Sequence, residues 1–205
     1  MKRLNRWVGA ALASALPIGA GFVLARTVDV GVTIERRAPS VRDTTEYWPR
    51  STPVPGPQIE MVFIGASTCG WSTREELAPA LNKLMLTLKQ IASDRHWSFR
   101  SVGVALDWSA SDGADYLNMM GHFDEIAAGY SWGNAQALRS IWDMPDGEPS
   151  TPQVILYTRR VIVAVDSLGP GRYAEVDRTP YATAVGIKRI LYWASSGGAE
   201  LEPPK

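Results

Sequence analysis

The stretch Met61-Val62-Phe63-Ile64-Gly65-Ala66-Ser67-Thr68-Cys69-Gly70-Trp71-Ser72 places a cysteine directly after an apolar run and a turn of small residues. The apolar run predicts a buried strand, and the residues after the turn predict a helix that Cys69 opens. At a helix N-terminus, unpaired N–H groups and the helix dipole stabilise the thiolate, which is the nucleophilic form of cysteine. The stretch therefore predicts a reactive thiol. The alternative is that Cys69 is a small buried residue packed at a turn.

The composition limits the chemistry that this cysteine can take part in. Cys69 is the only cysteine among 205 residues, which excludes an internal disulfide framework and a cysteine-based zinc site. Because the chain has only two histidines, His96 and His122, we expect neither a metal centre nor a cofactor. The 21 Lys and Arg residues balance the 21 Asp and Glu residues, so nothing in the charge indicates a nucleic-acid partner.

An export signal precedes the globular part of the sequence. Three basic residues within the first six positions come before the uncharged stretch 7–25, which is close to the length that a helix needs to span a bilayer. Residues 1–26 are therefore predicted to be a signal anchor that holds the rest of the chain on the extracytoplasmic, periplasmic side. Cleavage after Val23-Leu24-Ala25 would make them a signal peptide instead. The proline-rich residues 27–57 are predicted to be an extended linker.

Downstream of the linker, the apolar patterns alternate between strand and helix. The predicted elements are a strand over 58–65, a helix over 73–93, a strand over 98–107, a short helix over 112–120, a stub of strand over 123–127, a helix over 133–142, strands over 153–157 and 161–166, and a helix over 178–194. The short link Thr158-Arg159-Arg160 predicts that the two late strands form an antiparallel hairpin. Residues 196–205 are predicted to be a flexible tail.

This order of elements resembles the thioredoxin fold, and two local matches support the resemblance. In that family a Cys-x-x-Cys motif lies between the first strand and the first helix, where this chain has Cys69, and a cis-proline segment opens the third core strand, as Thr151-Pro152 does here. The resemblance covers residues 58–195. It implies a central mixed sheet flanked by helices, an insertion over 109–133 before the cis-proline strand, and a Pro152 loop that lies beside the cysteine. An N-terminal anchor and such an insertion also resemble the membrane-tethered thioredoxins of the TlpA and ResA type.

One departure from the family limits the reaction that the chain can perform. Ser72 stands where the second cysteine would be, so Cys69 could attack a disulfide but Ser72 could not resolve the product. We therefore predict monothiol exchange with protein thiols or disulfides, with Cys69 and Ser72 as catalytic residues. The resemblance implies that Thr151 and Pro152 contact the substrate, and Trp71 beside the cysteine is predicted to contact it as well. For Ser72, a hydrogen bond to the sulfur and a merely polar role in the first helical turn remain open.

Two other enzyme-site interpretations fit parts of the sequence. The motif Cys69-Gly70-Trp71-Ser72 also resembles the Cys-Gly-Phe-Ser motif of monothiol glutaredoxins, which bind an iron–sulfur cluster between two subunits. The export signal argues against this interpretation, because it separates the domain from cytosolic cluster assembly. A cysteine hydrolase would need a histidine base beside the thiol, and His122 with Asp124 or Asn134 is the available set.

A redox-inactive binding module is the remaining alternative. Four tryptophans fall in or near the loops expected around the cysteine, namely Trp71, Trp108, Trp132 and Trp142. Exposed tryptophans at that place would form a protein-binding patch, whereas buried ones would only build the core. A module with such a patch would serve as an accessory subunit of a membrane protein complex.

Overall fold

The computed structural model describes residues 54–142, 147–166, 169–197 and 199–204. The predicted signal anchor over 1–26 and nearly all of the predicted linker over 27–57 lie outside this range. Within the range, no helix combines the length and the apolar character that crossing a membrane requires.

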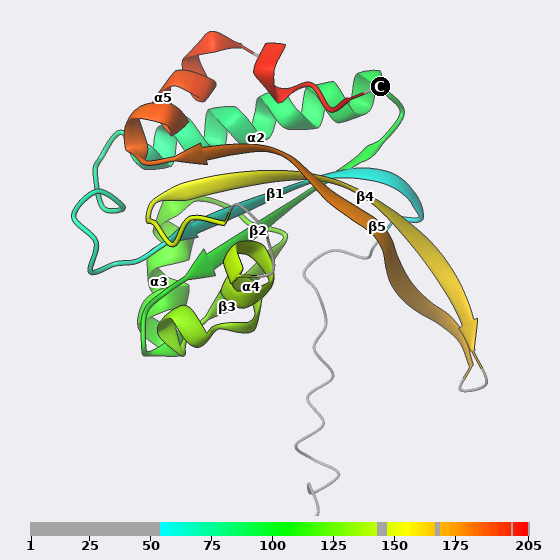
Figure 1. Cartoon of the computed structure of the whole chain (residues 1–205), viewed down its shortest axis with the longest axis horizontal. Coiled ribbons are helices and arrows are strands. Elements are labelled where there is room, and N and C mark those ends of the chain that lie inside the picture. The colour runs from blue at the N-terminus through cyan, green and yellow to red at the C-terminus, as the bar shows by residue number, and fades with distance from the viewer. Residues whose placement is uncertain (1–53, 143–146, 167–168, 198, 205) are drawn as a thin grey trace, which may run out of the picture. The chain divides into compact units, whose positions relative to one another are not determined.

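The described residues form an α/β domain with a five-stranded mixed sheet and four α-helices, and this arrangement resembles the thioredoxin-like fold (Figure 1). In chain order the elements are β1 (Gly56–Gly65), α2 (Leu77–Asp94), β2 (Ser98–Ala105), α3 (Ala110–Met120), β3 (Glu125–Ala128), α4 (Ala135–Ala137), β4 (Gln153–Asp166), β5 (Gly169–Val185) and α5 (Ile187–Ser196). The strands lie side by side in the order β3-β2-β1-β4-β5. β1, β2 and β3 are parallel, β4 is antiparallel to β1, and β5 is antiparallel to β4. The predicted insertion over 109–133 supplies α3 and the edge strand β3.

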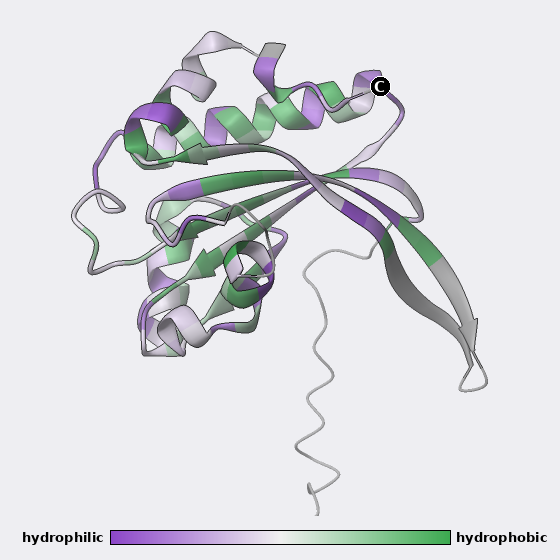
Figure 2. Cartoon of the chain, in the orientation of Figure 1, coloured by the Kyte–Doolittle hydropathy of each residue, from purple (hydrophilic) through white to green (hydrophobic). Residues whose placement is uncertain are grey.

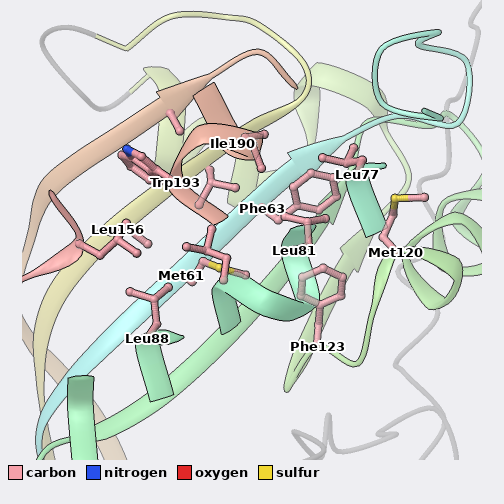
Figure 3. Packing of buried hydrophobic residues seen from close by; sticks show 14 of the residues in the cluster. Met61, Phe63, Leu77, Leu81, Leu88, Met120, Phe123, Leu156, Ile190 and Trp193 are labelled. Carbon is pink, nitrogen blue, oxygen red and sulfur yellow. The ribbon is translucent and has the colours of Figure 1, made fainter. Parts of the chain in front are cut away.

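The larger core lies between one face of the sheet and helices α2, α3 and α5. Alternate residues of β1 point into it, because successive side chains of a strand face opposite sides of the sheet. Four leucines of α2 recur at spacings of three and four and meet these strand residues along one helical face, namely Leu77, Leu81, Leu84 and Leu88. Figure 2 shows hydrophobic residues along the central strands, and Figure 3 shows Phe63 and Leu81 among the closely packed side chains. Each such side chain contributes roughly 1.5–3 kcal/mol by its burial.

A smaller apolar cluster covers the other face of the sheet. Val62 and Ile64 of β1 pack there with Ala137 and Ile141, which belong to α4 and to the π-helical turn Leu138–Trp142 that follows it. The helix predicted over 133–142 is therefore broken into short pieces. A continuous helix would turn Leu138, Ile141 and Trp142 toward the sheet, but only Ile141 is buried, and the Leu138 and Trp142 side chains are exposed.

The hairpin near the end of the chain differs from the prediction. Residues Thr158-Arg159-Arg160 do not form its turn: β4 continues through them and pairs with β5 on both sides, with a shift in register between Thr158 and Arg160. The segment has no glycine, proline or asparagine that would favour a turn. The side chain of Arg159 instead reaches back across the sheet, and its Nη1 lies 2.7 Å from Glu60 Oε2. The pairing of β4 with β5 extends as far as Asp166 and Gly169.

The last predicted helix begins later than expected, and the tail after it is packed. The first half of the helix predicted over 178–194 belongs to β5, and α5 begins only after Gly186, whose φ of 79° suits glycine. Within the segment 196–205, which is predicted to be a flexible tail, Ala199–Leu201 form a short 3-10 helix. The Leu201 side chain is fully buried, and its carbonyl accepts a hydrogen bond from Tyr181 Oη at 3.1 Å.

Candidate functional site

Cys69 lies in a hydrogen-bonded turn between β1 and α2. Its carbonyl oxygen accepts from the backbone N–H of Ser72 at 2.9 Å and of Thr73 at 3.2 Å. The prediction that Cys69 opens the helix is wrong, because α2 begins only at Leu77. Pro79 then sits in the first turn of the helix, where its missing N–H leaves no hydrogen bond unmade. The N-terminus of α2 is therefore not what acts on the thiol.

The loop that begins β4 lies against the sulfur, as the resemblance implied. The Thr151–Pro152 peptide bond is cis, and the Cys69 thiol donates to the Thr151 carbonyl oxygen at 3.6 Å. Pro152 is buried, and its carbonyl accepts from the backbone N–H of Gly186 at 2.8 Å. The structure thus brings Cys69, Thr151 and Pro152 together from positions 82 residues apart.

The surroundings of the sulfur favour its thiolate form. Burial raises the pKa of the Cys69 thiol, but the Ser72 and Thr151 side chains and the backbone N–H groups of Ser72 and Trp71, which can donate to a thiolate, lower it by more. The net pKa therefore lies below the ordinary value of a cysteine thiol. The direction of the shift is the one expected from the sequence, but its source is the turn and the Thr151 loop.

Ser72 belongs to this turn, and it is fully buried. No residue in the described part of the chain lies within ordinary hydrogen-bond distance of its Oγ with suitable geometry. Its carbonyl oxygen accepts from Tyr116 Oη at 3.0 Å, and burial raises the pKa of Tyr116 so that it remains a neutral donor. The Ser72 side chain lowers the pKa of Cys69. When Cys69 is ionised, its thiolate would be a strong hydrogen-bond acceptor for the buried Ser72 hydroxyl.

A groove of about 430 Å³ opens beside the thiol at the carboxyl ends of β1 and β2. It is lined by 66–69 after β1, by 106–109 after β2, by 131–132, and by Asp112 and Thr151. Figure 1 shows that these strand ends meet at one edge of the sheet. The groove is therefore built mainly from the loops that follow parallel neighbouring strands.

Asp107 forms part of the groove and was not predicted from the sequence. It is 5% exposed, and its carboxylate accepts from the Ser67 N–H at 3.2 Å and from the Ser67 hydroxyl. Its backbone oxygen accepts from the Ser131 N–H at 3.2 Å. Asp107 thus joins the Cys69 turn to the loop that carries Trp132. Its place at the end of the predicted strand 98–107 was the signal that could have found it.

Exposed tryptophan side chains lie in and beside the groove. The exposed fractions are 61% for Trp71, 83% for Trp108, 36% for Trp132 and 54% for Trp142. Trp108 and Trp132 line the groove itself, and Trp71 follows Cys69 within the turn. Trp142 is not among the groove residues. Three of the four tryptophans are therefore exposed at or next to the thiol.

The histidine that a cysteine hydrolase would need lies elsewhere. His122 and Asp124 line a separate cavity together with Ser101, whose hydroxyl donates to Asp124 Oδ2 at 2.9 Å. Asn134 is buried and caps α4, with its Nδ2 donating to the Gly129 carbonyl. None of these residues lines the Cys69 groove. Among the described residues, no group of three or more His, Cys, Asp or Glu side chains could hold a metal ion.

Two solved structures are similar to this chain at low identity. One is a thiol:disulfide interchange protein, a thioredoxin family protein from Chlorobium tepidum TLS, with 12% identity and a TM-score of 0.29 over 62% of this chain and 86% of that one. The other is yeast Sco1, with 16% identity and a TM-score of 0.32 over 60% of this chain and 73% of that one. No family model matches the chain, and no curated protein matches it.

Proposed function

We propose that this protein is a membrane-tethered, extracytoplasmic thioredoxin-like protein that performs monothiol thiol–disulfide exchange through Cys69. The observation that carries the proposal is the partly exposed thiol whose pKa is lowered and whose sulfur lies beside the Thr151 carbonyl. The thiolate attacks one sulfur of a substrate disulfide, forms a new S–S bond, and breaks the old one. The departing sulfur leaves as a thiolate and takes a proton from water.

The mixed disulfide must be resolved by a thiol from outside the chain, because Ser72 has no sulfur. Glutathione, another small thiol or a second protein attacks the mixed disulfide and returns Cys69 to its reduced state. In this scheme Ser72 stabilises the Cys69 thiolate, while Trp71, Thr151 and Pro152 contact the substrate segment. The open groove beside the sulfur gives that segment room to approach.

The tether is proposed from the sequence, since residues 1–26 and most of 27–57 lie outside the described range. The basic start and the uncharged stretch 7–25 support an anchor that stays in the membrane. N-terminal sequencing of the mature protein from a membrane fraction tests it. A mature chain that begins near Arg26 and is recovered in the soluble fraction would contradict the anchor.

The rate of iodoacetamide alkylation as a function of pH tests the thiol. With Cys69→Ser as the blank, we expect a midpoint clearly below the ~8.5 of a free cysteine. The reduced protein should also form one mixed disulfide with hydroxyethyl disulfide, visible as a mass increase that the Cys69→Ser variant lacks. A midpoint above about 9, or no mixed disulfide, would contradict monothiol exchange.

The exposed tryptophans favour one second candidate, a redox-inactive binding subunit of a membrane complex. Trp71, Trp108 and Trp132 would then form the contact surface, and the thiol would only be a neighbour. Cross-linking in membranes separates the two candidates. A binding subunit would keep its cross-linked neighbours in Cys69→Ser and lose them in Trp108→Ala.

A further inference from the structure

The groove beside Cys69 has a one-sided charge. Among the described residues that line it, Asp107 and Asp112 are the two charged side chains, and no Lys or Arg is present. The thiolate that forms during the proposed reaction adds a further negative charge at the same place. The negative charges of the groove therefore attract a positively charged group.

The aromatic lining supports the same kind of partner. Trp108 is 83% exposed beside the groove, and Trp132 forms another part of its wall. An indole face binds an ammonium or a guanidinium group by cation–π attraction. The same chain uses this contact elsewhere, where the Arg95 guanidinium lies 5.6 Å from the ring centre of Trp97.

One feature of the groove opposes this preference and is smaller. The N-terminus of α3 carries about half a positive charge and ends at the groove. Its Asp112 N–H is already bonded to the Ser109 hydroxyl at 3.3 Å, and the Asp112 carboxylate sits in the same first turn. The full negative charge of Asp112 exceeds the half charge of the helix end.

From these observations we propose that the groove selects protein segments in which a Lys or Arg stands next to the reacting cysteine or disulfide. This inference rests on the proposed monothiol exchange and names the substrate class of that reaction. The cation would lie between the Trp108 face and the Asp112 carboxylate, while the sulfur meets Cys69. A segment with acidic residues next to its cysteine would be repelled by the same groups.

Three small disulfides of different charge test the proposal on the reduced full chain in non-ionic detergent at low salt. The probes are cystamine, which is cationic, hydroxyethyl disulfide, which is neutral, and dithiodipropionate, which is anionic. The rate of mixed-disulfide formation at Cys69 is measured for each by mass spectrometry. Each rate is divided by the rate of the same probe with free mercaptoethanol, which removes the charge preference of any thiolate.

We expect the normalised rates to fall in the order cationic, neutral, anionic, with a ratio of about threefold per step. A unit charge about 6 Å from the reacting group in a water-like dielectric gives an effect of this size. Asp112→Asn should reduce the cationic-to-anionic ratio by about threefold. Trp108→Leu should slow cystamine more than dithiodipropionate. One molar salt should bring the ratios close to one, since exposed charges are then screened.

A matched variant on the same helix separates the groove from the overall charge. Asp115 is exposed on α3 but is not among the groove residues, so Asp115→Asn should leave all the ratios unchanged. Equal normalised rates for the three probes, a faster anionic probe, or equal losses in Asp112→Asn and Asp115→Asn would each overturn the proposal. If even the neutral probe fails to react, the monothiol reaction itself is wrong, which is a different result from equal rates.

Discussion

Two regions at opposite ends of β1 differ in whether their buried polar side chains have hydrogen-bond partners. Near the start of the strand, buried Glu60 lies 2.7 Å from Arg159 Nη1 and 2.8 Å from Arg178 Nε. Gln58 accepts from Arg159 Nε at 2.6 Å and donates to Ser98 at 2.9 Å. Beyond the end of the strand, the Ser72 hydroxyl is buried without a hydrogen-bond partner among the described residues, and indole rings face the solvent.

The difference shows which region holds the sheet together and which is left available for a reaction. Buried charges that are paired on several sides fix the positions of β1, β4 and β5 relative to one another. A buried hydroxyl that lacks an acceptor and lies beside a thiol does little for stability, but it can stabilise a charge that forms there. We therefore expect substitutions near the start of β1 to change stability and substitutions beyond its end to change the reactivity of Cys69.

The largest expected effect is on stability, at the Glu60 end. Glu60→Gln removes the carboxylate between Arg159 and Arg178 and should lower the free energy of unfolding by about 3 kcal/mol, because these arginines lose their counter-charge. Urea denaturation followed by circular dichroism measures this change. The alkylation rate of Cys69 should stay as in the unmodified protein.

A neighbouring arginine provides the control for that change. Arg160 follows Arg159 on β4, and its side chain is exposed. Arg160→Gln should therefore alter the unfolding free energy by no more than about 0.5 kcal/mol. Equal stability of Glu60→Gln and the unmodified protein would show that the cluster is not stabilising. A change in Cys69 reactivity would show that the two ends of β1 are coupled.

The same contrast explains what the sequence could predict. Strands β1 and β2, helix α2 and the place of Cys69 before α2 follow from local patterns of apolar residues, which the packed core requires. The closeness of Thr151-Pro152 to Cys69 came from the resemblance to a known fold rather than from any local pattern. These parts were predicted within a few residues of their observed bounds.

The errors occur where distant residues decide the local conformation. From local sequence alone, Arg159 is typical of a polar turn. It lies inside the sheet because its guanidinium pairs with Glu60, which is 99 positions earlier in the chain. The first half of the predicted last helix pairs with β4, and no pattern of spacing within that segment reveals the partner. The start of α2 at Leu77 also escaped prediction, because the turn after Cys69 carries helix-compatible residues.

The smallest expected effect is at the Ser72 end and is on reactivity rather than stability. Ser72→Ala removes a buried hydroxyl that has no hydrogen-bond partner among the described residues, so the unfolding free energy should change by no more than about 0.5 kcal/mol. The pKa of Cys69 should rise, because a hydroxyl that can donate to the thiolate is removed. Alkylation at neutral pH should slow by about three- to tenfold, which corresponds to one hydrogen bond of ~1 kcal/mol.

The pH dependence of this variant shows whether the hydroxyl acts on the thiolate. At a pH where the thiol is fully ionised, Ser72→Ala and the unmodified protein should react at similar rates, since only the fraction of thiolate differs between them. Ser140 offers the matched control: its hydroxyl is also fully buried without a partner among the described residues, but it lines another cavity. Ser140→Ala should leave alkylation unchanged at every pH. If both serine variants slow the reaction at neutral pH, or neither does, Ser72 has no specific action on the sulfur, and its place beside Cys69 is only structural.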